Sequence, residues 1–348
     1  MRSRTIIATP PGATIKEQLD DRGMTQKEFA VRMDMSEKHI SKLINGEVHL
    51  TPSVAFRLES VLGIPASFWN NLEARYQEKK IMAEEENAMD ADIELSKQMP
   101  YAEMVKLGWI EATRIATERV INLRRYFEVS RLGVIEQLLI PGIAYRRLSA
   151  TDRSSYMLAV WAQKARVEAR TIPVSPLNIQ RLHDIVPQIR QLTLEDPETF
   201  SPKLVEWFAE CGIAMVVLPH MKGSFLHGAS FYDGNKVVMG LTVRNHDADR
   251  FWFSLFHEVD HVLEGHIGQP DGPTDEDEDQ ANIFAANTLI PPQDYQSFVH
   301  RGQFSENSVR RFADTIGVDP GIVVGRLQND RIILHSQMNS MKKQYCLA

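Results

Sequence analysis

The chain has 348 residues, which is enough for two or three domains. Its apolar content of 43% and charged content of 24% are ordinary for a globular protein, and no apolar run is long enough to predict a membrane span. The N-terminal segment lacks the apolar core of a signal peptide, and the only cysteines, Cys211 and Cys346, are far apart in sequence. These features predict a cytoplasmic protein without a disulfide framework or a cysteine-rich zinc site.

The net charge of −7 is unevenly distributed along the chain. Residues 1–80 carry 12 Lys and Arg against 10 Asp and Glu, a net charge of +2, which leaves −9 for residues 81–348. A segment that binds nucleic acid is expected to be the less acidic part of a protein. Because this difference in charge is small, the prediction of nucleic-acid binding depends on the sequence motifs.

Residues 12–80 show a series of short amphipathic helices separated by turn signals. Gly23 is typical of the position after a helix, and Thr25 with Glu28 forms the pattern of a capping box. Ser36 is a suitable N-cap for the helix SEKHISKLI, which should end at Asn45-Gly46. Further helix starts are indicated at Thr51-Pro52 and near Trp69, Leu72 and Tyr76.

The pair TQKEFAVRM and SEKHISKLING has the arrangement of a helix-turn-helix, in which the second helix enters the DNA major groove. A small helical bundle with solvated charges is the alternative. Glu37 would be unfavourable near phosphate and suits a base donor such as cytosine N4. The candidate DNA-binding residues are Gln26, Glu37, Lys38, Ser41, Lys42 and Asn45.

The remainder of the chain divides into a helical and a mixed part. Residues 81–100 are acidic and indicate a helical or loose linker, and residues 101–200 show helical apolar spacing without a chemical motif. After residue 201 a short apolar run, IAMVVLP, predicts a strand, and GASFYDGNKVVMGL predicts a hairpin that turns at Asp233-Gly234. Helices are expected from Asp247, over QANIFAANTLIPP, and twice more in the tail.

The segment His257-Glu258-Val259-Asp260-His261 is an HExxH motif within an apolar run. On a helix, His257 and His261 lie one turn apart on the same face, so both imidazoles can bind one metal ion. Glu258 is then placed to act as the general base of a metal-assisted hydrolysis. A chance match on a buried or solvated helix is the alternative. The preceding hairpin could present an edge strand to an extended peptide substrate.

Catalytic zinc usually has three protein ligands, so a third is needed. The acidic run at 275–279 offers Glu276 and Glu278, although such a run is also typical of a solvated helix start. A donor that stabilises an oxyanion would also be needed. His266, Tyr295 and His300 are candidates, although each is more typical of a surface or packing residue.

Residues 10–80 resemble the Cro/CI-type helix-turn-helix of HigA-like antitoxins. The resemblance is carried by Gln26, Ala30, Ser36, Ile40, Ile44-Asn45-Gly46 and Phe68-Trp69. It implies sequence-specific binding to double-stranded DNA, usually as a homodimer on an inverted repeat, together with autorepression. A cognate toxin is a possible partner on this basis.

Residues 200–330 resemble the ImmA/IrrE metallopeptidase family, through FHEVDHVLEGH and the run from Glu278 to Pro291. The resemblance implies a gluzincin-like fold, Zn²⁺ bound by His257, His261 and Glu278, Glu258 as general base, and cleavage of a regulator protein. Asp260 departs from the family, which usually has a small residue there; it could turn outward as a partner of a ligand, or crowd the site. Peptide deformylase has a similar helix motif, but its other motifs are absent.

We therefore expect a mostly α protein with a small β-sheet: a helix-turn-helix domain (1–80), a helical scaffold (81–200) and an α+β gluzincin-like metallopeptidase domain (201–348). The predicted function is a DNA-binding, antitoxin-like regulator whose peptidase cleaves itself or a partner regulator. One alternative is a repressor whose C-terminal domain is a non-catalytic sensor or partner-binding module. A weaker alternative is a peptidase whose N-terminal module binds protein instead of DNA.

Overall fold

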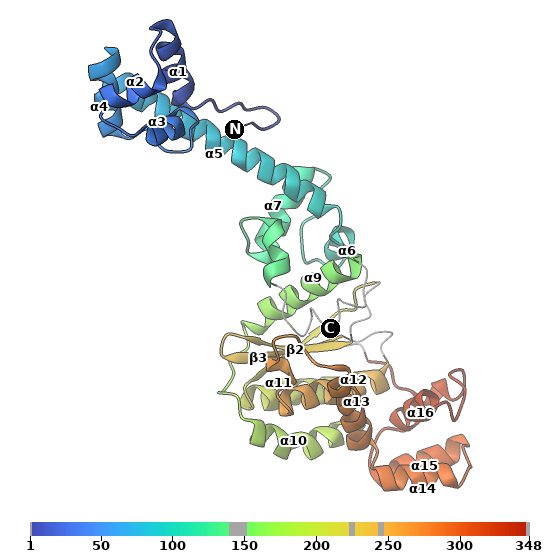
Figure 1. Cartoon of the computed structure of the whole chain (residues 1–348). Helices are drawn as coiled ribbons and strands as arrows, with labels where there is room; N and C mark the ends of the chain where they lie inside the picture. The colour runs from blue at the N-terminus through green and yellow to red at the C-terminus, as the bar shows by residue number, and fades with distance from the viewer. Residues whose placement is uncertain (1, 139–151, 223–226, 243–246, 346–348) are drawn as a thin grey trace. The chain divides into compact units, whose positions relative to one another are not determined.

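The computed structural model describes residues 2–138, 152–222, 227–242 and 247–345 (Figure 1). Cys346 lies outside these residues. The chain divides into two compact units, Met1–Glu94 (unit 1) and Leu95–Ala348 (unit 2), and each is considered by itself. No helix of the described residues is both long and apolar enough to cross a membrane.

Unit 1 is built from helices around a single core. Ile15, Phe29, Ile40, Leu58 and Trp69, which come from five successive helices, are all buried there. The segment 81–96 is not a loose linker, because the last helix continues through it. The helices are α1 (Pro11–Asp21), α2 (Gln26–Arg32), α3 (Glu37–Ile44), α4 (Pro52–Leu62) and α5 (Ala66–Ser96).

Side chains cap the short helices of unit 1 where the sequence predicts caps. Thr25, Ser36 and Thr51 each accept a hydrogen bond from a backbone N–H three residues later. The reciprocal half of the predicted capping box at α2 is not formed. The carboxylate of Glu28 instead accepts a hydrogen bond from Arg32, one helical turn later.

Unit 2 combines a small sheet with helices on both faces. Its elements before the sheet are α6 (Tyr101–Lys106), α7 (Ala116–Phe127), η1 (Leu132–Leu138), α9 (Asp152–Ala169), α10 (Ile179–Gln191), η2 (Leu192–Leu194) and α11 (Pro197–Glu210). From the sheet onward they are β1 (Ile213–Leu218), β2 (Gly228–Asp233), β3 (Lys236–Thr242), α12 (Ala248–Leu263), η3 (His266–Gly268), α13 (Asp275–Leu289), α14 (Pro292–His300), α15 (Glu306–Ile316), α16 (Pro320–Asn329) and η4 (Asn339–Met341).

Helical spacing was expected throughout residues 101–200, but after α6 the next helix, α7, begins only at Ala116. The hydroxyl of Thr113 accepts a hydrogen bond from the Ile115 N–H and donates one to Glu118, so this side chain forms a local turn in place of a helical one. The hydroxyl of Tyr101 donates to the carbonyl of Glu111, which holds the preceding loop.

The strands of the described residues form one sheet in the order β1-β3-β2. β1 is parallel to β3, and β2 is antiparallel to β3 as the other half of the predicted hairpin. The turn lies one residue later than predicted, because Asp233 still pairs with Lys236. Gly234 has a φ of 61°, a left-handed value that two-residue hairpin turns need at their first position and that glycine adopts without steric cost.

The sheet is a middle layer of unit 2, with α9 on one face and α10, α11 and α12 on the other (Figure 1). Met215, Val237 and Met239 point from the sheet into the core that α11 and α12 share. On the opposite face the indole of Trp161 lies directly over Gly240, where a Cβ atom would be 2.4 Å from the ring. This layering places α12, which carries the HExxH motif, directly against β2 and β3.

Candidate functional site

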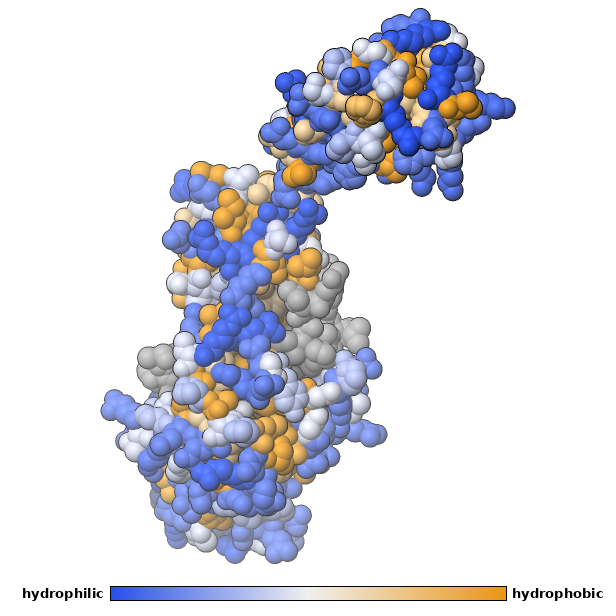
Figure 2. All heavy atoms as spheres, turned by 90° about the vertical axis from the view of Figure 1, so that its left-hand side faces the viewer, coloured by the Kyte–Doolittle hydropathy of each residue, from blue (hydrophilic) through white to orange (hydrophobic). Residues whose placement is uncertain are grey.

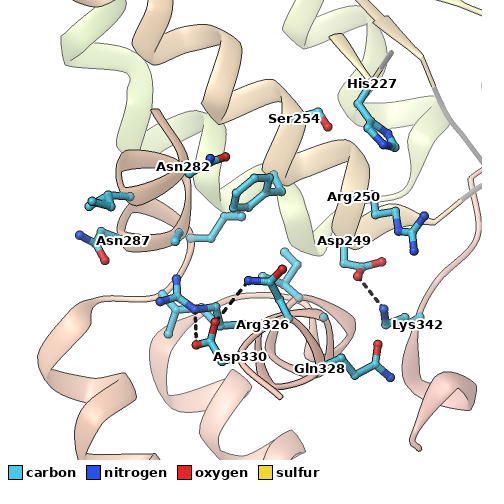
Figure 3. A pocket seen from close by; sticks show the side chains of 18 of the residues that line it. His227, Asp249, Arg250, Ser254, Asn282, Asn287, Arg326, Gln328, Asp330 and Lys342 are labelled. Atoms are coloured by element: carbon cyan, nitrogen blue, oxygen red, sulfur yellow. Dashed lines mark hydrogen bonds and ion pairs between the residues drawn. The ribbon is translucent and has the colours of Figure 1, made fainter. Parts of the chain in front are cut away.

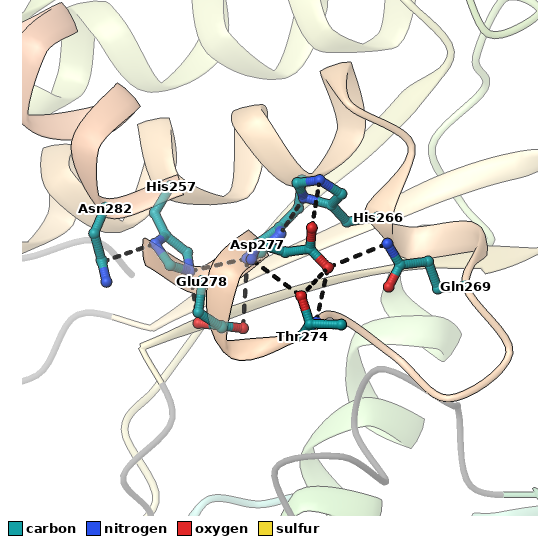
Figure 4. Close-up of polar contacts among 8 residues, drawn as sticks. His257, His266, Gln269, Thr274, Asp277, Glu278 and Asn282 are labelled. Atoms are coloured by element: carbon teal, nitrogen blue, oxygen red, sulfur yellow. Dashed lines mark hydrogen bonds and ion pairs between the residues drawn. The ribbon is translucent and has the colours of Figure 1, made fainter. Parts of the chain in front are cut away.

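α12 and α13 bring together three side chains that could hold a metal ion. His257 and His261 lie one turn apart on α12, and their Nε2 atoms are 3.1 Å apart. Glu278 comes from the first turn of α13, with one oxygen 3.3 Å from His257 Nε2 and the other 3.5 Å from His261 Nε2 (Figure 4). The two nitrogens and the carboxylate therefore point at one common position.

The spacing of these donor atoms fits a tetrahedral zinc ion. Ligands about 2.0–2.2 Å from zinc in tetrahedral geometry are roughly 3.3 Å from one another. The three donor atoms all lie within 4.8 Å of one another, with close approaches of 3.1, 3.3 and 3.5 Å. Two imidazoles and one carboxylate, with a fourth position left for water or substrate, are typical of a catalytic zinc site.

Hydrogen bonds at the outer nitrogens favour metal binding by the inner ones. His257 Nδ1 lies 3.1 Å from Asn282 Oδ1, an amide oxygen that can only accept. His257 therefore carries its proton on Nδ1 and directs the lone pair of Nε2 toward the cluster. Asn282 stands one turn after Glu278 on α13, so a single helix supplies both a candidate ligand and the group that orients another.

Glu258 of α12, the predicted general base, is buried against the first residue of β2. Its exposed fraction is only 2%, and its side chain is packed against Gly228. A Cβ atom at position 228 would lie 2.9 Å from Glu258 Cγ and 3.0 Å from its Oε1. The absence of a side chain at Gly228 thus makes room for this carboxylate.

Asp260, the departure from the family pattern, does not turn outward to solvent. Its exposed fraction is 2%, and its Oδ2 atom has no hydrogen-bond partner among the described residues. Burial raises the pKa of its carboxyl above the ordinary range, and the nearby Glu264 raises it further, whereas His266 opposes the shift. The acid is therefore enclosed beside the histidine cluster.

The other residues considered for the site lie in different surroundings. Glu276 is exposed and outside the cluster, whereas Glu278 is within it. The hydroxyl of Tyr295 donates to Asp330, the C-cap residue of α16, and His300 is exposed at the end of α14. His266 is buried and lies 3.1 Å from His261, so of the three oxyanion candidates it is the one that the structure brings to the cluster.

A cavity of about 830 Å³ adjoins the cluster and lies between α12, α13 and α16 (Figure 3). Phe253, which stacks with the ring of His257, and Asn282 both line it. Two ion pairs lie in its wall: Lys342 binds Asp249 at 2.7 Å, and Arg326 binds Asp330 at 2.8 Å. Apolar lining is supplied by Ile283, Leu289, Ile290 and Ile322. The volume is in the range of ligand-binding pockets.

The candidate DNA-binding residues of unit 1 lie on α3 and at its C-cap, except Gln26, which begins α2. Gln26, Glu37, Lys38 and Lys42 are exposed, and Asn45 is exposed at the C-cap of α3. Ser41 is half-buried, whereas Ile40, Leu43 and Ile44 face the core. Apolar side chains are scattered among hydrophilic ones on the face seen in Figure 2, and Val31 and Phe56 are among the exposed apolar residues.

Comparison with known proteins supports two domains in this chain. A family model described as helix-turn-helix matches residues 15–69, and one for a peptidase family, described as the IrrE N-terminal-like domain, matches residues 220–328. The fold and the sites thus define a DNA-binding domain and a metallopeptidase-like domain in one chain.

A relative with an assigned class supports the first of these domains. Over 80 residues, 23% of this chain and 81% of the relative, the sequence is 34% identical to the uncharacterized HTH-type transcriptional regulator YddM of Escherichia coli (strain K12). The chain belongs to the helix-turn-helix family of transcriptional regulators and carries, in addition, a domain of the IrrE-like peptidase family.

No motif in the sequence predicts a role for Asn282, Asp277 or Gly228, and His266 was predicted only as a candidate oxyanion donor. Asn282 could have been found from its spacing, since it follows Glu278 by four residues on the same helix. Gly228 had no local signal, because its role depends on how β2 packs against α12.

Proposed function

We propose that this protein is a DNA-binding transcriptional regulator with a zinc-dependent endopeptidase domain, which hydrolyses a peptide bond in itself or in a partner regulator. The proposal rests on one observation above all, the convergence of His257, His261 and Glu278 beside the buried Glu258. His257, His261 and Glu278 would hold the zinc ion. Cytoplasmic location is part of the proposal.

The chemistry follows from the order of residues along α12. Zinc, when bound, supplies the Lewis acidity that activates water and polarises a carbonyl for peptide hydrolysis. Glu258 takes a proton from the attacking water and returns it to the leaving amine. The packing of Glu258 against Gly228 excludes bulk water from one side of the carboxylate and fixes its orientation.

The substrate is proposed to be an extended polypeptide. β2 lies at the end of the sheet order β1-β3-β2, so a peptide can add to its outer edge by main-chain hydrogen bonds. Because β2 starts at Gly228, a peptide added there passes close to Glu258. The cavity beside His257 would accept a side chain of this peptide, and its apolar lining by Ile283, Leu289, Ile290 and Ile322 favours an apolar one.

Metal content and cleavage together test the enzymatic part. The purified full chain is expected to contain about one zinc ion per molecule, in line with a single His₂Glu site, and Glu278→Ala to lose it. Glu258→Gln is expected to retain zinc but to lose cleavage of itself and of a co-expressed partner regulator. A zinc-free protein that still binds its operator would contradict the peptidase proposal.

The DNA-binding part is proposed to act on an operator with an inverted repeat, with the chain as a homodimer and with a cognate toxin as a further partner. Lys38→Ala and Lys42→Ala are expected to weaken binding to the protein's own promoter and to lower its salt dependence by about one unit of slope per lost phosphate contact. Lys16→Ala, on the exposed face of α1, serves as control. Unchanged binding and salt dependence would show that α3 does not lie in the groove.

The buried Asp260 favours a second candidate, a repressor whose C-terminal domain is a sensor or partner-binding module without catalysis. This buried carboxyl has one oxygen without a hydrogen-bond partner among the described residues, at a position where the resembled peptidase family usually has a small residue. Zinc binding without cleavage of any co-expressed regulator, in both the wild type and Asp260→Gly, would favour this function over the peptidase. Cleavage gained by Asp260→Gly would identify Asp260 as the block.

A further inference from the structure

We propose that His266 and Asp277 are positioning residues that fix the tautomer of His261 and so prepare it to bind metal. The inference rests on the proposed metal site. It concerns the nitrogen of His261 that faces away from the cluster, which needs a hydrogen-bond acceptor if the inner nitrogen is to keep its lone pair. Neither residue belongs to the HExxH motif or to the third-ligand position.

Three side chains form a continuous path of contacts away from the cluster. His261 Nδ1 lies 3.1 Å from His266 Nδ1, and His266 Nε2 lies 3.2 Å from Asp277 Oδ1 (Figure 4). The direction of donation is set at the carboxylate end, because an ionised carboxylate can only accept. His266 therefore carries its proton on Nε2, its Nδ1 accepts from His261 Nδ1–H, and His261 Nε2 is left with its lone pair toward His257 and Glu278.

The backbone and the surroundings hold His266 in this place. Gly265 adopts a φ of 75° directly after α12, and this left-handed turn brings residue 266 back alongside the end of the helix. The imidazole of His266 is buried, and its ring meets that of His261 edge-on, with 5.3 Å between the ring centres. A histidine is thus enclosed with both ring nitrogens committed to partners.

Asp277 divides its two oxygens between two tasks. Oδ2 accepts from the Thr274 N–H and hydroxyl, both at 2.8 Å, and from Gln269 Nε2 at 3.2 Å, which completes the capping box at the start of α13. Oδ1 faces His266. The bonds from Thr274 and Gln269 hold the pKa of this carboxyl below its usual range. Helix capping alone needs only Oδ2, so the contact with His266 is a separate use of the same residue.

The two tasks can be separated by substitution in the full-length protein. In Asp277→Asn the amide oxygen can keep the cap, and the amide NH₂ then faces His266 and forces it into the opposite tautomer. His266→Leu removes the acceptor, whereas His266→Gln keeps an acceptor for His261 and a donor for Asp277. Thr274→Ala weakens the cap but leaves Asp277 Oδ1 on His266, and Glu276→Gln removes a charge from the same helical turn without touching the path.

Zinc affinity, measured by competition with a chromophoric chelator, is the first readout. Asp277→Asn and His266→Leu are expected to weaken zinc binding by about 10- to 100-fold, the usual effect of losing such an outer partner. His266→Gln is expected to restore most of the affinity. Thr274→Ala and Glu276→Gln are expected to bind zinc like the wild type, although Thr274→Ala lowers the melting temperature.

Nitrogen-15 NMR of the metal-free protein with labelled histidine is the second readout. We expect His261 to carry its proton on Nδ1 in the wild type and in His266→Gln, and on Nε2 in Asp277→Asn. Wild-type zinc affinity in both His266→Leu and Asp277→Asn, with binding abolished in Glu278→Ala, would overturn the positioning role of His266 and Asp277 but not the proposed metal site. A wild-type protein that binds no zinc would contradict the proposed metal site, while the tautomer of His261 would still decide the role of His266 and Asp277.

Discussion

Single atoms decide what the histidine cluster can do. The Nε2 atoms of His257 and His261 point at one another and at Glu278, and each outer Nδ1 atom has its own partner. The partner of His257 is an amide oxygen, and that of His261 is a second imidazole. In the proposed metal site, both arrangements would keep the inner lone pairs free for the ion.

Gly228 gives a prediction at the same scale. In Gly228→Ala the new methyl group would press on the Glu258 side chain and on Leu241 in a closely packed region, so we expect unit 2 to lose about 1–3 kcal/mol of stability. Denaturant unfolding measures the loss. Gly268→Ala is the matched control, because its Cβ would be 3.7 Å from the Tyr232 ring, an ordinary contact. Equal stabilities of the two variants would show that the contact with Glu258 is not tight.

Some site residues can be predicted from local spacing, whereas others need a family resemblance or the tertiary structure. The spacing of His257 and His261 fixes their common face once a helix forms, because the helical period is known. The choice between Glu276 and Glu278 required a family resemblance, since both lie in the first turn of α13. Asn282 and Asp277 acquire their roles only where α13 crosses α12, which no local pattern contains.

At the scale of elements, a carboxylate of α5 binds the N-terminal arm, which comprises residues 2–7. Residues 2–7 form a tight antiparallel turn, with Arg2 bridged to Ile7. Glu86 of α5 accepts hydrogen bonds from the Ser3 hydroxyl at 2.5 Å and from the Thr5 hydroxyl and N–H at 2.8 and 3.2 Å. These bonds, that of Ser3 foremost, hold the pKa of the Glu86 carboxyl below its usual range.

The lowered pKa of Glu86 predicts how pH affects the arm. The stabilisation is complete above the ordinary glutamate pKa and is lost as the pH falls through the lower value of the folded state. Hydrogen exchange at the Thr5 amide, corrected for intrinsic rates, should therefore show protection at neutral pH that disappears in acid. Glu86→Gln should remove most of this protection at neutral pH, whereas Glu78→Gln, exposed on the same helix, should not. Protection that persists in Glu86→Gln would mean that other contacts hold the arm.

Local signals predicted most element boundaries well. The caps Thr25, Ser36 and Thr51 act as the sequence indicates, since an N-cap bond joins residues only three apart. The delayed start of α7 at Ala116 and the one-residue shift of the hairpin turn were not predicted. In both cases competing local hydrogen bonds or the pairing register of the strands decided between neighbouring possibilities.

For the whole molecule, the division into two units predicts two unfolding transitions. Each unit has its own core, so calorimetry of the full chain should resolve separate events for residues 1–94 and 95–348. Zinc at about 100 times its dissociation constant should stabilise only the second unit, by about 2.7 kcal/mol. Glu278→Ala should abolish this shift. A single transition that zinc shifts as a whole would show that the two units unfold together.

The class of each part of this protein could be predicted before its structure was known. Helical periodicity, caps and the HExxH spacing are short-range features, so they predict the short helices and the common face of two histidines without knowledge of the fold, and the resemblance to known families adds the helix-turn-helix class. Only the tertiary structure brought Glu278 to those histidines, enclosed Asp260, placed Gly228 against Glu258 and connected His261 through His266 to Asp277. Each of these depends on contacts between separate elements, and their packing against one another is set by the core of the whole unit.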